Sequence, residues 1–370
     1  MSSFHGEKIH LSIFGSSHSP SIGMNLEGIP ANLSIDYDEL CRFLARRAPG
    51  RNDISTSRME PDLPVFVNGI ESGITTGEII TSQIQNKDVR SADYDNLKNC
   101  PRPGHADFTA HVKYDGKLDM AGGGPFSGRM TAPLCIAGGL CKQWLSQVGV
   151  QITAHISAIG NIAIDSNLVN PVVPDIRMIP SDFPVIDPVK SEEMKSEIRK
   201  AKEDGDSVGG IIQCIVTGLP IGLGDCMFGG MESRIASIIF GIPAVKGISF
   251  GSGFYGSTLR GSVNNDPFCV VDSKIKTQTN RSGGILGGIT NGMPLMFDVA
   301  VKPTPSIAKP QASVFLDSLI QTELGIKGRH DPCIVPRAVP VVEAAAAIAL
   351  LDAWLDYFGG ISNGSNQIER

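Results

Sequence analysis

The segment that most constrains the fold is a mostly apolar run near the C-terminus, from Ala338 to Tyr357. It has Pro340 near its first turn, four consecutive alanines inside it, and Gly359-Gly360 after it. Proline is tolerated in a first helical turn, alanine favours helix, and glycine commonly ends one. The run therefore predicts a helix that is buried in the core of the protein.

The residues just before this helix, Gly328 to Arg337, combine two arginines with His330, Asp331 and two prolines. The prolines keep the segment from being helical. Arginine binds carboxylate or phosphate in bidentate fashion, and a carboxylate close to such cations stays ionised and can accept a proton. Because a core helix anchors the loop, it predicts a preorganised anion site with a proton-transfer group. Taken alone, a surface salt-bridge loop would be at least as good an interpretation.

Composition limits the possible partners. The 370 residues are 41% apolar, enough for a real core, and the 42 glycines with only 6% aromatic residues indicate many tight turns. A net charge of −6 argues against nucleic acid or an anionic membrane surface as the main partner. Any affinity for anions must therefore be local.

The cysteines and the N-terminus indicate the compartment. The eight cysteines form no Cys-x-x-Cys pair, so neither a zinc site nor a disulfide scaffold is indicated, and we expect reduced thiols in the core. Met1 to Phe14 lacks the apolar centre of a signal peptide, and no uninterrupted apolar stretch reaches the length of a membrane span. We expect a soluble, cytoplasmic protein.

Helices and strands are mixed along the chain without a βαβ rhythm, and no joint is long enough to be a linker. We therefore expect one intertwined α+β domain over residues 1–370. Ile35 to Arg47 is predicted to be a helix with Ser34 as its N-cap and two arginines at its end. The other predicted helices are Thr131 to Val148, Glu192 to Lys202, Met231 to Phe240 and Ala312 to Leu324. The predicted strands are Lys8 to Phe14, Leu63 to Val67, Glu78 to Gln83, Val150 to Ile159, Gly210 to Thr217, Gly247 to Phe250 and Leu295 to Val301.

Two loops each place a histidine where the chain reverses. Gly15 to Pro20 contains His18 among three serines, and Arg102 to Asp107 contains His105. A single loop histidine is more often a solvated surface residue than a catalytic one, and that interpretation holds for either loop by itself.

Two glycine-dense segments offer backbone amides to a ligand. Gly122 to Arg129 opens the helix predicted from Thr131, where amides could approach a phosphate or a flat ring closely. Asn280 to Gly292 leads into the strand that ends before Lys302 to Ser306. Neither segment has a Rossmann or P-loop signature. Together they suit a large phosphorylated cofactor, although structural glycines and a bulged sheet corner are the alternatives.

These blocks resemble the chorismate synthase family in type, order and spacing along nearly the whole chain. The resemblance rests on so many separated blocks that coincidence is excluded as an explanation. The matching blocks are Arg46 to Gly50, Thr75 to Gly77, Asn86 to Asp88, Arg102 to Asp107, Asp206 to Gly210, Ala244 to Gly247, Gly283 to Gly292, Lys302 to Thr304, Gly328 to Val342, and Glu343.

The resemblance implies an activity and a fold. Members of this family convert 5-enolpyruvylshikimate 3-phosphate to chorismate in the shikimate pathway of aromatic amino acid biosynthesis. The reaction is an anti 1,4-elimination of phosphate from C3 and hydrogen from C6, and it needs reduced FMN although it is redox-neutral. The family fold is a β-α-β sandwich, with helices between two antiparallel sheets, assembled as a homotetramer.

The resemblance also implies roles for individual residues. His18 would protonate the departing phosphate, His105 would stabilise charge on the flavin, and Asp331 would assist proton removal, with Ser127 nearby. The implied substrate-binding cations are Arg46, Arg47, Arg129 and Arg337, although Arg46 and Arg47 could equally stabilise a helix C-terminus. The implied FMN contacts are Phe126, Ser127, Pro243, Ala244, Gly287, Lys302, Pro303, Thr304, Pro305, Ser306 and Arg329, and no metal is implied.

The chain departs from the family pattern in places. Ser16 and Ser19 replace a glutamate and a glycine in the first block, and Pro125 and Met130 replace an arginine and a glutamate beside the flavin. Asp53 stands where many members have arginine, and Ser252 where aspartate is common. The histidines, Ser127 and the site arginines remain, so we expect activity to be retained.

Two alternatives to a monofunctional synthase are open. One is a catalytically silent relative that binds flavin or a phosphorylated ligand. The other is a bifunctional enzyme that reduces its own flavin with NADPH. The chain has no recognisable nicotinamide fingerprint, so we expect a monofunctional enzyme that depends on an external flavin reductant.

Overall fold

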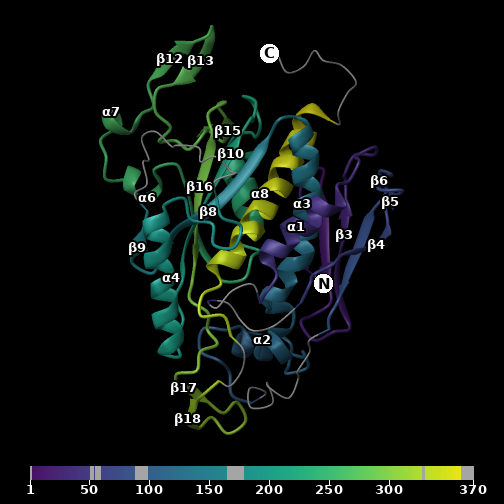
Figure 1. The fold of residues 1–370 in the computed structure, drawn as a ribbon, viewed down its shortest axis with the longest axis vertical. Coiled ribbons are helices and arrows are strands. Elements are labelled where there is room, and N and C mark those ends of the chain that lie inside the picture. Colours follow the sequence, from purple (N-terminus) through teal and green to yellow (C-terminus); the bar gives the residue numbers. More distant parts are fainter. Residues whose placement is uncertain are drawn as a thin grey trace.

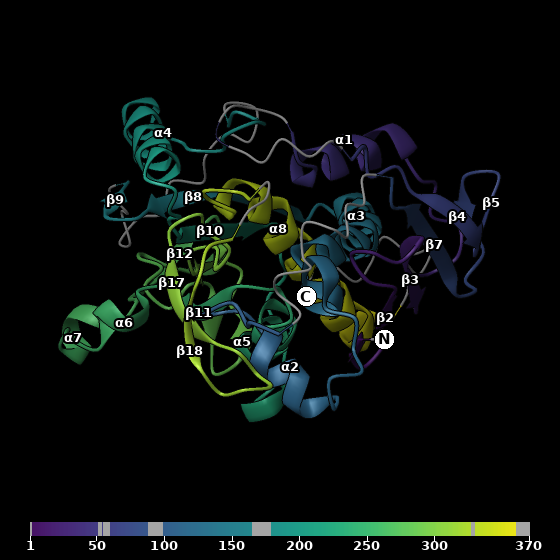
Figure 2. The same cartoon turned by 90° about the horizontal axis from the view of Figure 1, so that it is seen from below.

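Two antiparallel sheets enclose a layer of helices in the computed structural model, which describes residues 2–50, 54, 60–87, 99–164, 179–326 and 330–359. In Figure 1 the first sheet lies on the right, the second on the left, and α1, α3 and α8 between them. Figure 2, seen from below, shows the same three layers end on. The α+β sandwich predicted from the sequence is confirmed.

The first sheet has five strands in the order β1-β2-β3-β7-β4. Its inner face is apolar because alternate residues of the central strand, Ile22, Met24 and Leu26, are fully buried. That face packs on α3. The strands are β1 (Ser2–His5), β2 (His10–Phe14), β3 (Ser21–Glu27), β4 (Val65–Asn68) and β7 (Ile80–Gln85).

The second sheet also has five strands, in the order β11-β16-β10-β8-β9. Ile212, Cys214 and Val216 of the central strand face inward and are fully buried, and α8 packs against this side. The strands are β8 (Gln151–Ile159), β9 (Ile162–Ala163), β10 (Gly210–Thr217), β11 (Val245–Phe250) and β16 (Leu295–Val301).

The inner layer consists of α1 (Tyr37–Arg47), α3 (Thr131–Gln147) and α8 (Val335–Phe358). From Val335 to Leu355 all but two residues of α8 are buried, because the helix lies between α3, α5 and the second sheet. Trp144 of α3 and Trp354 of α8 meet edge to face with ring centroids 6.1 Å apart. By length and composition α8 could also span a membrane, but its most apolar window is wholly buried inside the molecule. It is the core helix predicted from the sequence.

The remaining elements lie around the sandwich. The short hairpins are β5 (Ile70–Glu71) with β6 (Ile74–Thr75), β12 (Phe268–Val271) with β13 (Lys274–Thr277), β14 (Ile285–Leu286) with β15 (Ile289–Thr290), and β17 (Gln311–Val314) with β18 (Gln321–Leu324). The outer helices are α2 (Asp107–Lys113), α4 (Pro188–Glu203), α5 (Met231–Ile239), α6 (Gly253–Gly256) and α7 (Gly261–Asn264). Short 3-10 segments are η2 (Ala121–Phe126), η3 (Gly128–Met130) and η5 (Met227–Gly229).

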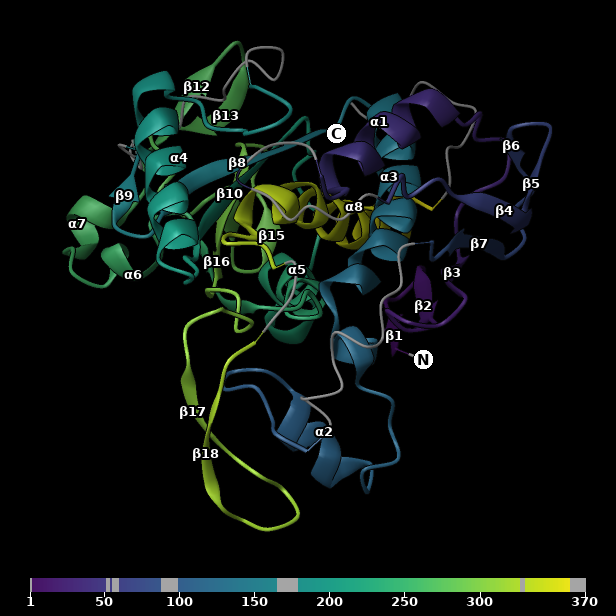
Figure 3. The ribbon, with the colours of Figure 1, turned by 60° about the horizontal axis from the view of Figure 1, so that its bottom comes forward.

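The prediction of a helix from Ala312 to Leu324 is wrong, because this segment forms the hairpin β17–β18. The hairpin extends below the sandwich beside α2 (Figure 3). Most of the apolar side chains that favoured a helix are exposed here, and Leu319 is 81% exposed with a positive φ of 57°. The hairpin is instead held through its backbone, with Leu316 N donating to Asn99 O at 2.9 Å. The N-cap of α1 was also predicted wrongly: Asp36, not Ser34, accepts from Glu39 N at 2.7 Å.

The expectation of core thiols holds for five cysteines and is wrong for three. Cys226 is exposed, and Cys41 and Cys269 are partly exposed. The buried thiols are Cys100, Cys135, Cys141, Cys214 and Cys333, and burial raises the pKa of Cys135 and Cys333 to about 12. Such thiols stay protonated and unreactive near neutral pH.

Candidate functional site

A turn of three glycines brings the two predicted histidines together. Gly122, Gly123 and Gly124 all have positive φ, which glycine adopts without strain. A Cβ on Gly122 would overlap the ring of His18, and one on Gly123 would lie 3.3 Å from His105 Nε2. Both imidazoles can therefore lie against the turn because its residues have no side chains.

Ser127 lies beside the same turn. A Cβ on Gly123 would lie 3.5 Å from Ser127 Cβ, on the side where it meets His105. Ser127 Oγ accepts from Arg129 N at 3.3 Å at the start of η3. The predicted residues His18, His105 and Ser127 are thus neighbours although they come from three separate segments.

The His18 loop is fixed to this turn by hydrogen bonds. Ser17 N donates to Gly124 O at 3.3 Å, and Ser17 Oγ donates to Ala121 O at 2.8 Å. His18 Nδ1 lies 3.1 Å from Ser17 Oγ. From the other side, Asn86 Nδ2 donates to Ser19 O at 2.7 Å.

The His105 loop is organised by an aspartate and an arginine. Asp107 accepts from Arg102 Nε and Nη2 at 2.7 Å each, and from Arg102 N at 3.0 Å. His105 Nδ1 lies 2.7 Å from Asp107 Oδ1. Burial alone would raise the pKa of Asp107, but Arg102 and His105 outweigh it and hold that pKa well below its usual range. Arg102 Nη1 also donates to Ser306 Oγ at 3.2 Å, which joins this loop to the predicted cofactor segment.

The segment from Lys302 to Ser306 closes one side of the site. Lys302 Nζ donates to Gly104 O, next to His105, and Lys302 N donates to Ala244 O at 3.0 Å. Burial and the neighbouring Lys246 lower the pKa of Lys302. Thr304 Oγ1 is buried and has no hydrogen-bond partner among the residues that the structure describes.

The Asp331 loop is tied to that segment through residues 207–208. Val208 N donates to Pro332 O at 2.9 Å, and Ser207 Oγ donates to Thr304 O at 2.7 Å. The segment at Pro332 therefore lies close to the one at Thr304, although the two are far apart in the sequence.

Asp331 is paired with an arginine of α8. Arg337 Nη1 donates to Asp331 Oδ2, and Arg337 Nε donates to Arg47 O at 3.0 Å. The side chains of Asp331 and Arg337 are 10% and 20% exposed, so the pair keeps a solvent-facing edge. Burial lowers the pKa of Arg337 although Asp331 opposes the effect.

Arg47 and Arg129 share one buried carboxylate. Both donate to Asp62, whose side chain is fully buried, and Arg129 Nη2 also donates to Glu60 at 3.0 Å. Arg129 Nε donates to Asn86 Oδ1 at 3.0 Å. Burial would raise the pKa of Asp62, but the two guanidiniums lower it. In this conformation the two arginines are turned toward internal acceptors.

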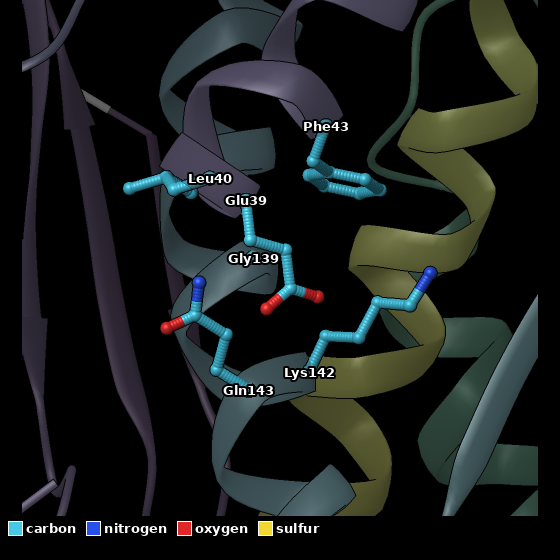
Figure 4. Close-up of a pocket in the computed structure, with 6 residues that line it drawn as sticks. All are labelled: Glu39, Leu40, Phe43, Gly139, Lys142 and Gln143. Carbon is cyan, nitrogen blue, oxygen red and sulfur yellow. The ribbon is translucent and has the colours of Figure 1, made fainter. Parts of the chain in front are cut away.

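Arg46 lies on another side of α1 from its neighbour Arg47. Its two terminal nitrogens donate to Glu343 of α8 at 2.9 and 2.8 Å. Lys142 of α3 donates to the same carboxylate, and Figure 4 shows its side chain extending from α3 toward α8. The small hollow drawn there has room for about one water molecule and is lined by Glu39, Leu40, Phe43, Gly139, Lys142 and Gln143. This polar cluster is separate from the histidines.

One predicted cofactor residue, Gly287, lies far from the others within the same subunit. Gly287 is in the turn of the β14–β15 hairpin, shortly before Leu295 at the start of β16, whereas Lys302 follows the end of that strand. A strand of this length spans roughly 20 Å, so Gly287 and Lys302 lie at opposite ends of the second sheet. Arg329, like Asp53 and Gly328, lies outside the described residues.

The other predicted cofactor residues lie around the two histidine loops. Phe126, 39% exposed, ends the glycine turn. Pro243 precedes Ala244, which has a positive φ of 72°. A Cβ on Gly104 would lie 3.6 Å from Pro305 Cβ, and one on Gly209 would lie 2.9 Å from Pro303 N. Among the departures from the family pattern, Ser19 Oγ accepts from Ser16 N at 2.8 Å and so shapes the first loop.

Sequence reasoning missed the acidic partners of the site. Asp62 and Glu60 were assigned no role, and Arg102 and Asp107 were noticed only as parts of a block. The sequence does carry a weak signal, since Glu60-Pro61-Asp62-Leu63-Pro64 places two carboxylates in a segment that its two prolines keep from being helical. It does not indicate which cations those carboxylates meet.

The geometry provides two kinds of chemistry. Two imidazoles at the glycine turn, and the Asp331 carboxylate on a loop joined to them through residues 207–208 and 302–306, are groups that can give and take protons. Arg337 and Lys302 supply positive charge beside them, as an anionic ligand requires. Among the described residues no group of three His, Cys, Asp or Glu side chains is placed to hold a metal ion.

Comparisons with known proteins agree with one another. The sequence profile described as chorismate synthase matches residues 9–355. A chorismate synthase of Dehalococcoides mccartyi is 44% identical over 95% of this chain and 96% of its own length. One from Korarchaeum cryptofilum is 42% identical over 94% of this chain and 96% of its own. A crystal structure of chorismate synthase superposes with a TM-score of 0.76 at 28% identity, covering 96% of this chain and 94% of that one. The chain therefore belongs to the chorismate synthase family.

Proposed function

We propose that this protein converts 5-enolpyruvylshikimate 3-phosphate to chorismate, as a carbon-oxygen lyase of the shikimate pathway. Family membership over residues 9–355 supports the reaction. The observation that carries the assignment to this site is the glycine turn at Gly122 and Gly123, which gathers His18, His105 and Ser127.

The substrate carries one phosphate and two carboxylates, so it requires fixed positive charge. Arg337 supports this role best, because its guanidinium keeps a partly exposed edge beside Asp331. Arg47 and Arg129 contribute positive charge behind Arg337. They can contact the substrate directly only if their ion pairs with Asp62 and Glu60 break. Arg46 stays a prediction from the sequence, since Glu343 accepts both of its terminal nitrogens here.

The protons have candidate donors and acceptors. His18 Nδ1 is engaged by Ser17 Oγ, so Nε2 is the atom to give a proton to the departing phosphate. Asp331, held beside Arg337, assists removal of the C6 hydrogen by taking a proton at its carboxylate. His105 presents Nε2 to the glycine turn next to Ser127, where it stabilises developing negative charge.

The residues present fit a flavin mononucleotide. Lys302 and Ser306 offer a cation and a hydroxyl on the segment beside Arg102, and the buried Thr304 Oγ1 is without a partner in the described chain, as a phosphate-binding hydroxyl would be before its ligand arrives. Phe126 offers a partly exposed aromatic side chain against which a flat ring can pack, next to the glycine turn. When bound, reduced FMN supplies electron density to the breaking C–O bond and recovers it as hydrogen leaves C6.

The separation of Gly287 from Lys302 bears on assembly. If both contact one flavin, Gly287 comes from a neighbouring subunit, which supports the homotetramer. Exposed apolar side chains such as Phe228 and Phe254, 87% and 86% exposed, are consistent with contacts between subunits. We propose a cytoplasmic homotetramer that receives its flavin already reduced rather than reducing it with NADPH.

Anaerobic turnover tests the function. Intact protein with chemically reduced FMN should form chorismate, and NADPH with FMN alone should not support turnover. His105→Ala and Asp331→Ala should each lower kcat by roughly 10²- to 10⁴-fold. His111→Ala, at an exposed histidine of α2, is the matched control and should leave kcat unchanged. Folded, flavin-loaded protein without turnover would make a silent binding protein the better assignment, and light scattering on the same sample should give four chains.

A further inference from the structure

Asp107 is a buried carboxylate that the proposed chemistry does not use. It is the first residue of α2, but its side chain points back to Arg102 and His105 rather than capping that helix. Its side chain is 7% exposed, and its two oxygens lie against donors of the His105 loop. This carboxylate therefore interacts with protein donors and hardly with solvent.

The contacts decide which nitrogen of His105 carries a proton. Nδ1 lies 2.7 Å from Asp107 Oδ1 and 3.1 Å from Arg102 Nη2. An ionised carboxylate only accepts hydrogen bonds, and a guanidinium only donates them. If Nδ1 were bare, two acceptors would face each other at 2.7 Å. If Nδ1 is protonated, it donates a hydrogen bond to Asp107 Oδ1. Arg102 Nη2 then donates its hydrogen bond to the same oxygen, at 2.7 Å, and not to the ring.

The second nitrogen then faces the site. A Cβ on Gly123 would lie 3.3 Å from His105 Nε2, so this atom is directed at the backbone-only turn beside Ser127. With the proton fixed on Nδ1, the neutral ring leaves Nε2 bare, and the ring that gains a proton gains it at Nε2. Asp107 then holds the resulting cation from behind.

We infer that Asp107 is a positioning residue that fixes His105 as the Nδ1-protonated tautomer and directs Nε2 into the site. Arg102 completes the device, because it orients Asp107 through both carboxylate oxygens and links it to Ser306 through Nη1. The tautomer follows from contacts within the protein, while its consequence for turnover rests on the proposed function.

In the variant Asp107→Asn we expect His105 to adopt the opposite tautomer. The Oδ2 position faces two donors of Arg102, the backbone N and Nε, so the amide oxygen should take that position. The amide NH₂ then occupies the Oδ1 position, where Arg102 Nη2 loses its acceptor and has to move away, and donates to His105 Nδ1. The variant should therefore carry its proton on Nε2 instead of Nδ1.

The test is ¹⁵N NMR of protein labelled at its seven histidines, without flavin, at a pH where the rings are neutral. The His105 signals are identified by their loss in His105→Asn. We expect an Nδ1-protonated ring in the intact protein and an Nε2-protonated ring in Asp107→Asn. Asp115→Asn, an exposed aspartate just beyond α2, is the control and should leave the signals unchanged. An Nε2-protonated His105 in the intact protein overturns the inference without need of any variant.

Kinetics separate positioning from structural support. With reduced FMN, Asp107→Asn should lower kcat by about 10- to 100-fold, within the range of a proton-transfer group, with little change in KM for the substrate. A variant that keeps full kcat with an inverted tautomer would also overturn the inference. If intact protein shows the Nδ1-protonated ring but no chorismate formation, the proposed function fails while the tautomer assignment stands.

Discussion

Glu343 is a buried carboxylate at the centre of the helical layer, with 1% of its side chain exposed. It accepts from both terminal nitrogens of Arg46, from Lys142 and from Ala154 N of the second sheet. Burial would raise its pKa, but the two cations outweigh that effect and lower the pKa to about 2. One side chain thus links α8 to α1, α3 and β8.

We expect Glu343→Gln to lower the free energy of unfolding near neutral pH by about 3 kcal/mol, because Arg46 and Lys142 lose their buried counter-charge. The folded-state pKa, about 2, is below the ordinary value of 4.5. The ionised carboxylate therefore stabilises the fold above that ordinary value, and the stabilisation is lost as pH falls toward the folded value. At about pH 3.5 the gap between variant and intact protein should have shrunk by roughly 1 kcal/mol.

Urea unfolding at several pH values measures this gap. Glu193→Gln is the matched control, because Glu193 makes a similar ion pair with Lys190 on the exposed face of α4. It should change the free energy of unfolding by about 0–1 kcal/mol at every pH. A pH-independent gap for Glu343→Gln would contradict the assigned pKa.

Arg46 and Arg47 show what cannot be predicted from single residues of the sequence. Arg46 and Arg47 were predicted together as substrate cations and are adjacent in the sequence. Successive residues of a helix point about 100° apart, so the two side chains meet different surroundings: Arg46 reaches Glu343, and Arg47 reaches Asp62. The sequence indicates the helix and its final charges but not the partner of either charge.

At the scale of elements, α3 and α8 pack closely against each other at a glycine. A Cβ on Gly138 would overlap Cα and Cβ of Ala344, which are fixed by the backbone of α8. A Cβ on the next residue, Gly139, would meet side chains of α1 instead: Cδ1 at the end of the flexible Leu40 side chain at 2.5 Å and Cδ1 of the Phe43 ring at 3.3 Å. Two adjacent glycines of one helix therefore differ in what surrounds them.

Gly138→Ala should lower the free energy of unfolding by about 1–3 kcal/mol or more, because the two helices have to move apart. Gly139→Ala should cost less, since Leu40 can change rotamer and alanine favours helix by roughly 1 kcal/mol. Urea unfolding of both variants checks the difference. Equal effects would mean that the two helices do not pack closely at Gly138.

Whether a predicted helix or strand was confirmed depended on whether the rest of the molecule covers its apolar face. The strands Gly210–Thr217 and Leu295–Val301 have the predicted bounds, and α3 begins at the predicted Thr131. The segment from Ala312 to Leu324 has a similar apolar content but forms a hairpin. A helix of that length needs an apolar partner for a whole face, whereas among the described residues only Leu324 of this segment is buried, beside Cys100 and Ile326. The strand β3 was not predicted, although it is central to the first sheet.

At the scale of the whole molecule, both sheets and the helices between them contribute to one apolar cluster. It includes Leu26 of the first sheet, Ile136 and Leu350 of the central helices, and Ile212 of the second sheet. The single domain over residues 1–370 stays a prediction, and this continuity is the reason to test it. The continuity also indicates that the layers depend on one another for stability.

We therefore expect one cooperative unfolding transition. The two tryptophans, Trp144 and Trp354, report the separation of α3 from α8, while far-ultraviolet circular dichroism reports mainly the loss of helices and sheets. Urea curves followed by the two signals should coincide. Two resolved midpoints would indicate separate folding units instead of a single domain.

The sequence by itself determined the core helix, most strands of the two five-stranded sheets, the turns that need glycine, and the residue types able to do acid-base and anion chemistry. Those features show in local patterns, because apolar periodicity and turn residues can be recognised within a few positions of the chain. Only the tertiary structure decided that Asp107 faces His105, that Asp62 lies between Arg47 and Arg129, and that Arg46 meets Glu343. The physical reason is separation along the chain: Arg46 and Glu343 are 297 positions apart. Which buried charge meets which partner is set by how the layers pack, and no local pattern encodes it.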